Sequence, residues 1–585
     1  MRVGAVVVAP ALLALLFSFS TTGTLPRPAL EPLFGASSAA ALAAQLSTEY
    51  PSRVPGTDGA EGAARWYGET ISALGLPTEE DVWTDELPDL GGVELRNVVT
   101  VVSGRSDETI VLVAHRDNAG ADRRLGDNAS GTAALIELAR GYAPQEIAPA
   151  PLPQRTLVFV STDAGAYGGA GAVRFAEESP YAAKALAVIV LDGLGGRGRP
   201  RIAIAGDRPN SPARALVSTA AARVTEQVGV TPALPSVPTQ LVDLGIPYAA
   251  GEQGPFLARG IAAVTITTEE RRDHVSARDS DTSLDVRKLG RFGRATDALV
   301  GSIDASVGAA FRTPDSLFLA DRAASGWAVR LTLIVAVVPF ALGVLDLLVR
   351  SRRRGFPLAP ALRGLRVRVG FWLYGGLLLW IGAVTAVFPT GASLPLPPYS
   401  SSVADWPIAG LALLCIAFAG GWLASRRRLI PAIRPTQEER LAGYSVALTG
   451  LGLVAVALAL VKPYALVFVL PSLYAWLWLP LHSRFSARAG LYVLGLAGPV
   501  GGLEVLAHEL RIGVFEAVRY VTGLATVGYV SLGSVLLTLA WAAAAAQLAA
   551  LAFGRYAPYA GGAEPPPPGI FRMSVARIAH GVRGR

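Results

Sequence analysis

Cysteine, lysine and histidine are scarce in this chain of 585 residues. Its one cysteine, Cys415, lies in an apolar run. A single cysteine excludes an intramolecular disulfide, a CxxC motif and a cysteine zinc site, and it leaves the redox compartment open. Lysine occurs only at positions 184, 288 and 462, so arginine supplies nearly all of the net charge of +7. Of the five histidines, only His115 and His274 precede the hydrophobic C-terminal part.

Charged residues are also missing from long stretches of the C-terminal part. Hydrophobic residues make up 51% of the chain, and its mean hydropathy of +0.42 is high for a soluble protein. Much of the arginine borders the hydrophobic runs. The basic balance therefore indicates membrane topology better than it indicates nucleic-acid binding.

The N-terminal segment is apolar from Val3 to Phe19 and follows Arg2. This run is long enough for a signal peptide or a membrane anchor. Only Thr21-Thr22-Gly23 follows, without a clear small-residue cleavage site, so we expect an uncleaved transmembrane anchor over residues 1–24. Either a signal peptide or an anchor would export the residues that come next.

Residues 37–310 alternate between strand-like and helix-like patterns. This alternation predicts an α/β domain with a mixed, mostly parallel sheet flanked by helices, and its length is ample to bury a core. Helical patterns include Arg65–Leu74, Pro212–Val228 and Leu284–Ile303. The strand-like runs are Val98–Val102, Thr109–Ala114, Thr156–Ser161, Ala187–Leu191, Arg201–Ala205 and Ile261–Thr267.

Residues 327–555 are predicted to form an all-α transmembrane bundle of about seven helices. Each apolar segment is about long enough for a hydrocarbon core of ~30 Å. The stretch Val514–Val530 is compatible with either a further span or an interfacial helix. The predicted spans are Leu331–Val349, Val369–Val387, Trp406–Ala424, Leu441–Val461, Tyr464–Leu481, Ala489–Leu506 and Val530–Phe553.

Arginine clusters follow the first, third and fifth of these segments, and the tail 556–585 is basic as well. By contrast, the loop Pro389–Asp405 contains neither lysine nor arginine. The positive-inside rule then places both termini in the cytoplasm and residues 37–310 on the extracytoplasmic side. With the N-terminal anchor the spans number eight, and this topology requires an even number.

Polar residues follow three of the strand-like runs. His115-Arg116-Asp117 ends one run, Gly126–Gly131 (GDNASG) opens the next helical pattern, and Asp192 ends the run ALAVIVLD. His274 follows another run, in the loop DHVSARDSDTSLD. In open α/β folds such residues meet at the carboxyl edge of the sheet, where sites usually lie.

These motifs resemble those of the co-catalytic zinc aminopeptidases of peptidase family M28. The similarity covers about residues 48–300, and it includes SRVPGTDG at Ser52–Gly59 and GPFL at Gly254–Leu257. In many members the second segment begins with Ser-Asp-His, where this chain has Gly251-Glu252-Gln253.

The resemblance implies one or two zinc ions and hydrolysis of peptide bonds, of the exopeptidase or aminopeptidase type. Its implied metal ligands are His115, Asp127, Asp192 and His274, with Asp127 bridging two ions. Asp117 would orient the imidazole of His115. A single ion could keep His115, Asp127 and Asp192 and an open position, which is a sound zinc site.

The family also has a Glu-Glu pair, a general base followed by a zinc ligand, after the strand that here reads TLVFVSTDAG. Gly165 and Ala166 occupy those two positions, and neither can bind a metal or accept a proton. Asp163 is the nearest carboxylate and a candidate replacement. Continued strand alternation would place Asp163 and Gly165 on the same side of the chain.

Three functions are compatible with this pattern. The first is an active, membrane-anchored metallopeptidase acting on a peptide or protein substrate. The second is an inactive peptidase fold that binds a substrate or partner in a membrane complex, because the layout resembles both the endoplasmic-reticulum metallopeptidases and the attachment subunit of the GPI transamidase. The third is transport, but Asp346, Glu504 and His508 all lie near span ends, where snorkelling explains them.

Overall fold

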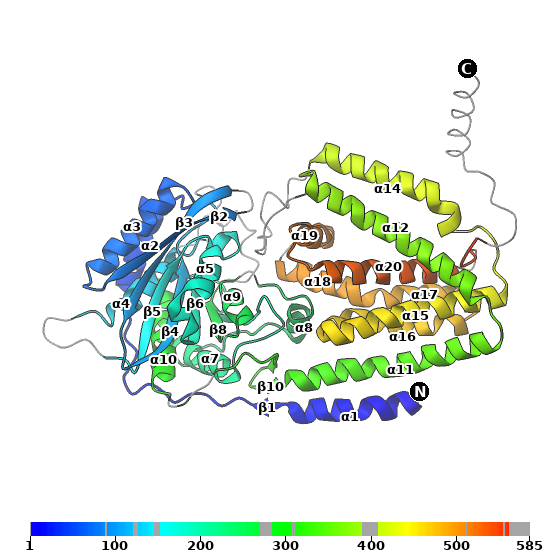
Figure 1. Cartoon of the computed structure of the whole chain (residues 1–585). Helices are drawn as coiled ribbons and strands as arrows, with labels where there is room; N and C mark the ends of the chain where they lie inside the picture. Colours follow the sequence, from blue (N-terminus) through cyan, green and yellow to red (C-terminus); the bar gives the residue numbers. More distant parts are fainter. Residues whose placement is uncertain are drawn as a thin grey trace, which may run out of the picture.

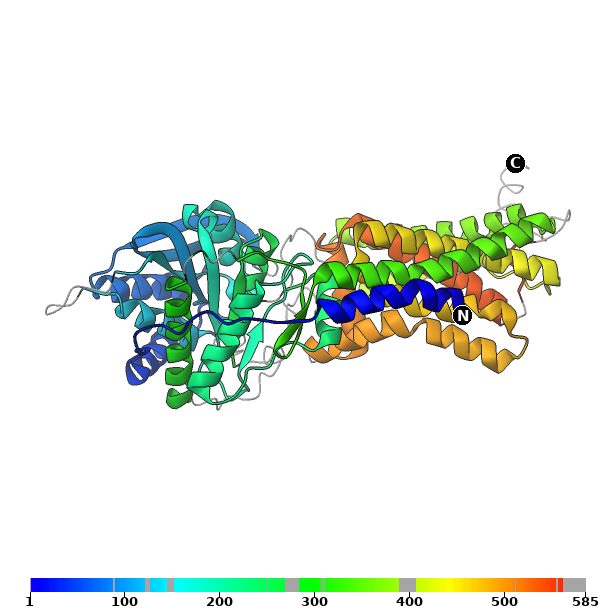
Figure 2. The ribbon, with the colours of Figure 1, turned by 90° about the horizontal axis from the view of Figure 1, so that it is seen from below.

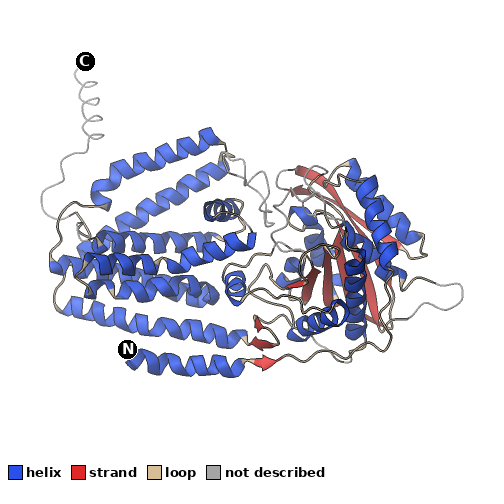
Figure 3. Cartoon of the chain, turned by 180° about the vertical axis from the view of Figure 1, so that it is seen from behind, coloured by secondary structure: helices blue, strands red, loops and turns tan. Residues whose placement is uncertain are grey.

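The described residues form two parts, an α/β domain and a helical bundle, and their strands lie in or beside the first (Figures 1 and 3). The computed structural model describes residues 2–87, 90–120, 127–144, 152–249, 251–268, 284–306, 308, 311–388, 407–510, 512–553 and 556–560.

The α/β domain is built on a seven-stranded sheet with the strand order β2-β3-β5-β4-β6-β8-β7. The central pairs β5/β4, β4/β6 and β6/β8 are parallel, and the outer pairs are antiparallel. This sheet confirms the predicted fold class. The strands are β2 (Thr78–Leu87), β3 (Gly91–Val102), β4 (Ser106–His115), β5 (Arg155–Thr162), β6 (Ala185–Asp192), β7 (Arg201–Ala203) and β8 (Ala263–Thr267).

Helices cover both faces of the sheet, so its central strands are apolar on both sides. In β4, Ile110, Leu112 and Ala114 pack on one face, and Val111 and Val113 pack on the other. Continuous apolar runs of this kind are typical of buried parallel strands. The first face is covered by α2 (Ala36–Glu49), α3 (Asp58–Ser72), α4 (Ala129–Arg140), α7 (Arg214–Val228) and α10 (Val286–Asp304), and the second by α5 (Ala170–Glu178), α6 (Pro180–Ala183) and α9 (Gln253–Ala258).

All six strand-like runs of the sequence are strands in the structure, whereas β2 was not predicted. It lies at the edge of the sheet and pairs only with β3 among the described strands. Glu79 and Glu80 are exposed on it, so half of its pattern is acidic rather than apolar.

A small antiparallel sheet joins the two parts of the chain. Its strands are β1 (Ser20–Thr21), β10 (Arg322–Ala324) and β9 (Leu317–Leu319), in that order. The apolar helix α1 (Arg2–Ser18) enters it from one side and lies alongside α11 (Gly326–Arg353), as Figure 2 shows. The first helix of the chain therefore belongs to the bundle.

Among the residues that the structure describes, six helical segments of the bundle are long and apolar enough to cross a membrane. The sixth predicted span, Ala489–Leu506, is instead a pair of helices bent by 45°, α17 (Phe485–Gly495) and α18 (Ala497–Leu510). Large apolar side chains face outward, including Leu413 (69% exposed) and Ile416 (70%), as expected for contact with lipid. The six segments are α11, α12 (Leu358–Val384), α14 (Ile408–Leu429), α15 (Gln437–Val461), Pro463–Leu481 with α16 (Leu466–Leu477), and α20 (Leu532–Ala552).

The α/β domain lies at one end of the bundle, and the arginine clusters lie at the other (Figure 1). Helix α11 starts beside β10 and carries Arg350, Arg352 and Arg353 in its last turn, and α14 ends with Arg426–Arg428. Helix α19 (Val514–Thr526) crosses the end that faces the α/β domain, and it is seen end-on in Figure 1. In this structure it is not a span but a short helix across the bundle.

Candidate functional site

The carboxyl edge of the sheet brings two of the predicted ligands together. His115 ends β4 and Asp192 ends β6, the parallel strand beside it. The Nε2 atom of His115 lies 3.8 Å from Oδ1 of Asp192. Both side chains come from rigid, buried strands, so their positions are set by the core of the domain.

Asp117 holds the other nitrogen of the His115 ring. Its Oδ1 lies 3.2 Å from Nδ1 of His115, and it also accepts hydrogen bonds from the backbone N–H groups of Gly165 (2.7 Å) and Ala166 (2.9 Å). A carboxylate accepts only, so Nδ1 is the donor and Nε2 is directed towards Asp192. Metal-binding histidines commonly have such a partner on their other ring nitrogen, so this contact is compatible with the role expected for Asp117.

The surroundings of His115 favour a positive charge at this point. Burial alone lowers the pKa of the imidazole, but the hydrogen bond to Asp117 and the nearby carboxylate of Asp192 raise it well above its ordinary value. A proton or a metal ion on Nε2 would equally satisfy the two carboxylates.

Asp127 is held at the same edge by its neighbour Asn128. The Asn128 side chain caps α4 by accepting from Gly131 N, and it also donates to Leu191 O (2.7 Å) and accepts from Gly193 N (2.9 Å). These bonds fix the loop before α4 to the end of β6. Asp127 itself accepts from Ala129 N and pairs through Oδ1 with the fully buried guanidinium of Arg53.

His274, the fourth predicted ligand, lies outside the described residues. The described chain leaves this edge at Thr268, whose hydroxyl donates to Gly193 O, and returns at Leu284. Asp285 N then donates to Gly195 O (3.1 Å). Both ends of the intervening segment are therefore attached to the loop that follows Asp192.

The loop after β5 corrects one expectation. Strand β5 ends at Thr162, Ala164 has a left-handed backbone with φ of 55°, and a 3₁₀ turn follows at Gly165–Tyr167. Strand alternation therefore does not extend from Asp163 to Gly165. The turn brings the N–H groups of residues 165 and 166 onto Asp117 instead.

Asp163 is occupied by other partners. Its Oδ2 lies 3.2 Å from a guanidinium nitrogen of buried Arg116 and 3.2 Å from Arg96 N, and its Oδ1 accepts from Ala164 N. These contacts favour a structural role, in which Asp163 neutralises Arg116, over the base or ligand predicted from the sequence.

Glu252 is a buried carboxylate that was not predicted as a site residue. The sequence did contain a hint of it, because Gly-Glu-Gln stands where many family members have Ser-Asp-His. Oε1 of Glu252 accepts a hydrogen bond from Thr162, and Oε2 has no partner within the described part of the chain. Burial raises the pKa of Glu252 to about 7, with His115 and Thr162 acting in the opposite direction.

The helical bundle holds the segment that leads to Glu252. Tyr248 lies between the rings of Tyr520 and Tyr529, with centroid distances of 5.9 and 6.1 Å. The Tyr529 hydroxyl donates to Asp207 Oδ1 (3.0 Å), which also accepts from Ala249 N. Contacts from beyond the α/β domain therefore help to position one side of the site.

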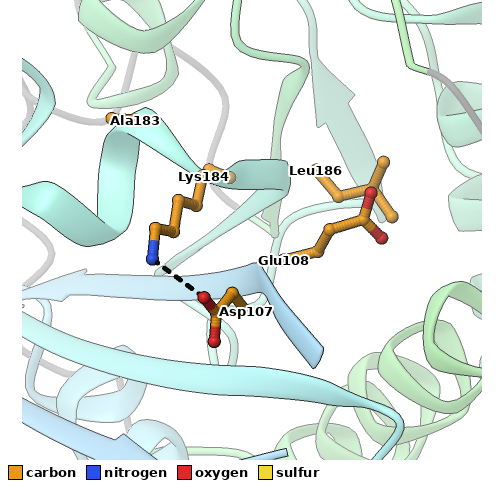
Figure 4. A pocket seen from close by; sticks show the side chains of 6 residues that line it. Asp107, Glu108, Ala183, Lys184 and Leu186 are labelled. Atoms are coloured by element: carbon orange, nitrogen blue, oxygen red, sulfur yellow. Dashed lines mark hydrogen bonds and ion pairs between the residues drawn. The ribbon is translucent and has the colours of Figure 1, made fainter. Parts of the chain in front are cut away.

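A shallow pocket at the opposite edge of the sheet is separate from this site. It is lined by Asp107, Glu108 and residues 183–186, at the amino ends of β4 and β6 (Figure 4). Lys184 reaches across it to Asp107 at 3.3 Å. Because His115 and Asp192 lie at the other ends of the same strands, this pocket contributes nothing to their chemistry.

The donor chemistry at the carboxyl edge fits part of a zinc site. Imidazole nitrogen and carboxylate oxygen both bind zinc, and 3.8 Å is shorter than about 4.1 Å, twice a zinc–ligand distance. However, within the residues that the structure describes, no three His, Cys, Asp or Glu side chains are arranged to hold a metal ion. The pair of His115 and Asp192 fits one ion that needs further ligands.

Comparisons with known proteins give one matching family model and a number of similar solved structures. No curated protein matches the chain. Among solved structures, it is similar to a glutaminyl cyclase of Porphyromonas gingivalis (18% identity, covering 46% of this chain and 98% of that one, TM-score 0.35). It is also similar to the LapA aminopeptidase of Legionella pneumophila (17% identity, covering 47% of this chain and 73% of that one, TM-score 0.38). A third similar structure is a Zn-dependent exopeptidase of Parabacteroides distasonis (18% identity, covering 46% of this chain and 99% of that one, TM-score 0.34). The model of peptidase family M28 matches residues 97–300, and the chain therefore contains a peptidase family M28 domain.

Proposed function

We propose that this protein is a membrane-anchored zinc metallopeptidase that hydrolyses peptide bonds in the manner of an exopeptidase. The observation that carries this proposal is the His115 imidazole, held on Nδ1 by Asp117 and directed with Nε2 towards Asp192. A buried histidine between two carboxylates is not needed to stabilise the fold. At the carboxyl edge of an α/β sheet, such a group indicates a functional site.

One zinc ion suits these residues better than two. His115, Asp192 and Asp127 would hold it and would leave one position open for water or substrate. Asp127 already faces the charge of Arg53, which opposes a second cation beside it. Gly165 and Ala166 also remove the glutamate that family M28 supplies to a second ion. When bound, zinc would supply Lewis acidity towards the peptide carbonyl.

The α/β domain is proposed to lie outside the membrane and both termini in the cytoplasm. This orientation is supported by the arginine clusters, which lie at the end of the bundle remote from the α/β domain. By the positive-inside rule, that end faces the cytoplasm. The substrate would then be an extracytoplasmic peptide or protein.

Hydrolysis by the full chain in detergent tests this function. On a panel of aminoacyl nitroanilides and dipeptides, we expect activity that falls at least roughly 100-fold with a zinc chelator and returns with added zinc. Asp192→Asn should prevent the return because it removes a ligand. Asp107→Asn, an exposed aspartate at the opposite edge, is the matched control and should behave as the wild type.

The alternative is a peptidase fold that binds a substrate or partner without cleaving it. The replacement of the Glu-Glu pair by Gly165 and Ala166 and the pairing of Asp127 with Arg53 favour it. It predicts no chelator-sensitive hydrolysis on any substrate of the panel, together with a stable protein partner that co-purifies with the chain in detergent. That combined result would replace the enzyme proposal.

A further inference from the structure

The loop after β5 has no room for the carboxylate that family M28 places there. A Cβ atom added to Gly165 would lie 2.3 Å from both Cβ and Cγ of His115, well inside van der Waals contact. The N–H groups of Gly165 and Ala166 are already bonded to Asp117. This loop therefore holds the His115–Asp117 pair and cannot supply a proton acceptor.

Glu252 comes to the same place from another part of the chain. It precedes α9, and its Cγ lies 3.9 Å from where a Cβ of Gly169 would be, so its side chain lies over the glycine turn. Thr162, which donates to Oε1, pairs with His115 across the parallel strands β5 and β4. The carboxylate of Glu252 thus reaches the carboxyl edge next to His115.

The second oxygen of Glu252 is distinguished by its lack of a hydrogen-bond partner in the described part of the chain. The residue is only 4% exposed, and its Oε2 makes no hydrogen bond to the described residues. Leaving a buried carboxylate oxygen unpaired is costly, and native proteins rarely do so without a functional reason. A water molecule between Oε2 and the His115–Asp192 pair would satisfy it.

We propose that Glu252 replaces the missing glutamate of the family as the proton acceptor for hydrolysis. The water oxygen forms a bond to the peptide carbonyl carbon, and one water proton moves to Oε2 of Glu252. That proton then passes to the amide nitrogen as the C–N bond breaks, which leaves a carboxylic acid product and a free amine. This assignment rests on the proposed peptidase function.

The test compares Glu252→Gln, Glu252→Asp and the exposed-residue control Glu94→Gln in the full chain. Glu252→Gln has the same shape, so we expect an unchanged melting temperature, unchanged bound zinc by elemental mass spectrometry, and a fall in kcat of roughly 10²–10⁴-fold. Glu252→Asp keeps the acid and should retain more activity than Glu252→Gln. Glu94→Gln should change nothing.

The outcomes separate this assignment from the proposed function. An active wild type with an equally active Glu252→Gln variant would overturn the assignment alone. Loss of zinc in Glu252→Gln would overturn it too, because Glu252 would then be a metal ligand. A wild type that cleaves nothing would refute the peptidase function, and the assignment with it.

Discussion

Replacing Arg53 by methionine is expected to destabilise the α/β domain by about 3–5 kcal/mol, the usual cost of removing one partner from a buried ion pair. The guanidinium is fully buried and donates to the carbonyl oxygens of Arg116 and Tyr50, both at 2.6 Å, and to Asp127. Methionine fills a similar volume but leaves these acceptors without donors. In a domain of this size the change corresponds to a fall in Tm of roughly 10 °C.

Thermal unfolding of the full chain, followed by tryptophan fluorescence, measures this effect. Arg65→Met is the matched control, because Arg65 makes an exposed pair with Glu61 on α3 and its loss should cost only about 0.3–0.5 kcal/mol. Equal melting temperatures for the two variants would show that Arg53 does not connect the loops around Asp127.

Restoring the family's glutamate at position 165 is expected to damage the site rather than repair it. Any side chain there would bring its Cβ to 2.3 Å from His115, so the ring or the loop must move. Overpacking of this kind costs about 1–3 kcal/mol. It would also break the bond from Gly165 N to Asp117, which positions the imidazole. We expect Gly165→Glu to lower zinc content and hydrolysis at least roughly 10-fold, as a shift of about 1 Å can do.

Gly165→Ala and Gly68→Ala separate this steric effect from a general effect of adding a methyl group. Gly68 lies within α3, and a Cβ there meets nothing within 4 Å. Alanine should therefore stabilise the helix at position 68 by about 0.5–1 kcal/mol and destabilise the protein at position 165. A Gly165→Glu variant more active than the wild type would contradict this account of the loop.

The features that could be predicted from the sequence are those marked by a pattern of neighbouring residues, such as a continuous apolar run. The apolar runs of β4, β5 and β6 are buried on both faces, so their composition alone marks them as strands. His115 and Asp192 follow directly from them, because parallel strands end at one edge. The charged edge strand β2 has no such signal, since the outward half of its residues faces solvent.

The features that the sequence did not predict depend on contacts between distant segments. Thr162 and Glu252 are 90 residues apart, and Arg53 and Asp127 are 74 apart. No periodicity links such residues. The position of Asp163 could not be predicted either. The prediction assumed that strand alternation continues to Gly165, but the left-handed turn at Ala164 ends the strand first.

The number of zinc ions bound per chain tests the central claim most directly. Elemental mass spectrometry of the full chain in detergent would compare the wild type with His115→Ala and Asp192→Asn. The account predicts one zinc ion per wild-type chain, lost in both variants. A wild-type chain that binds no zinc, or that keeps its zinc when His115 is replaced, would contradict it.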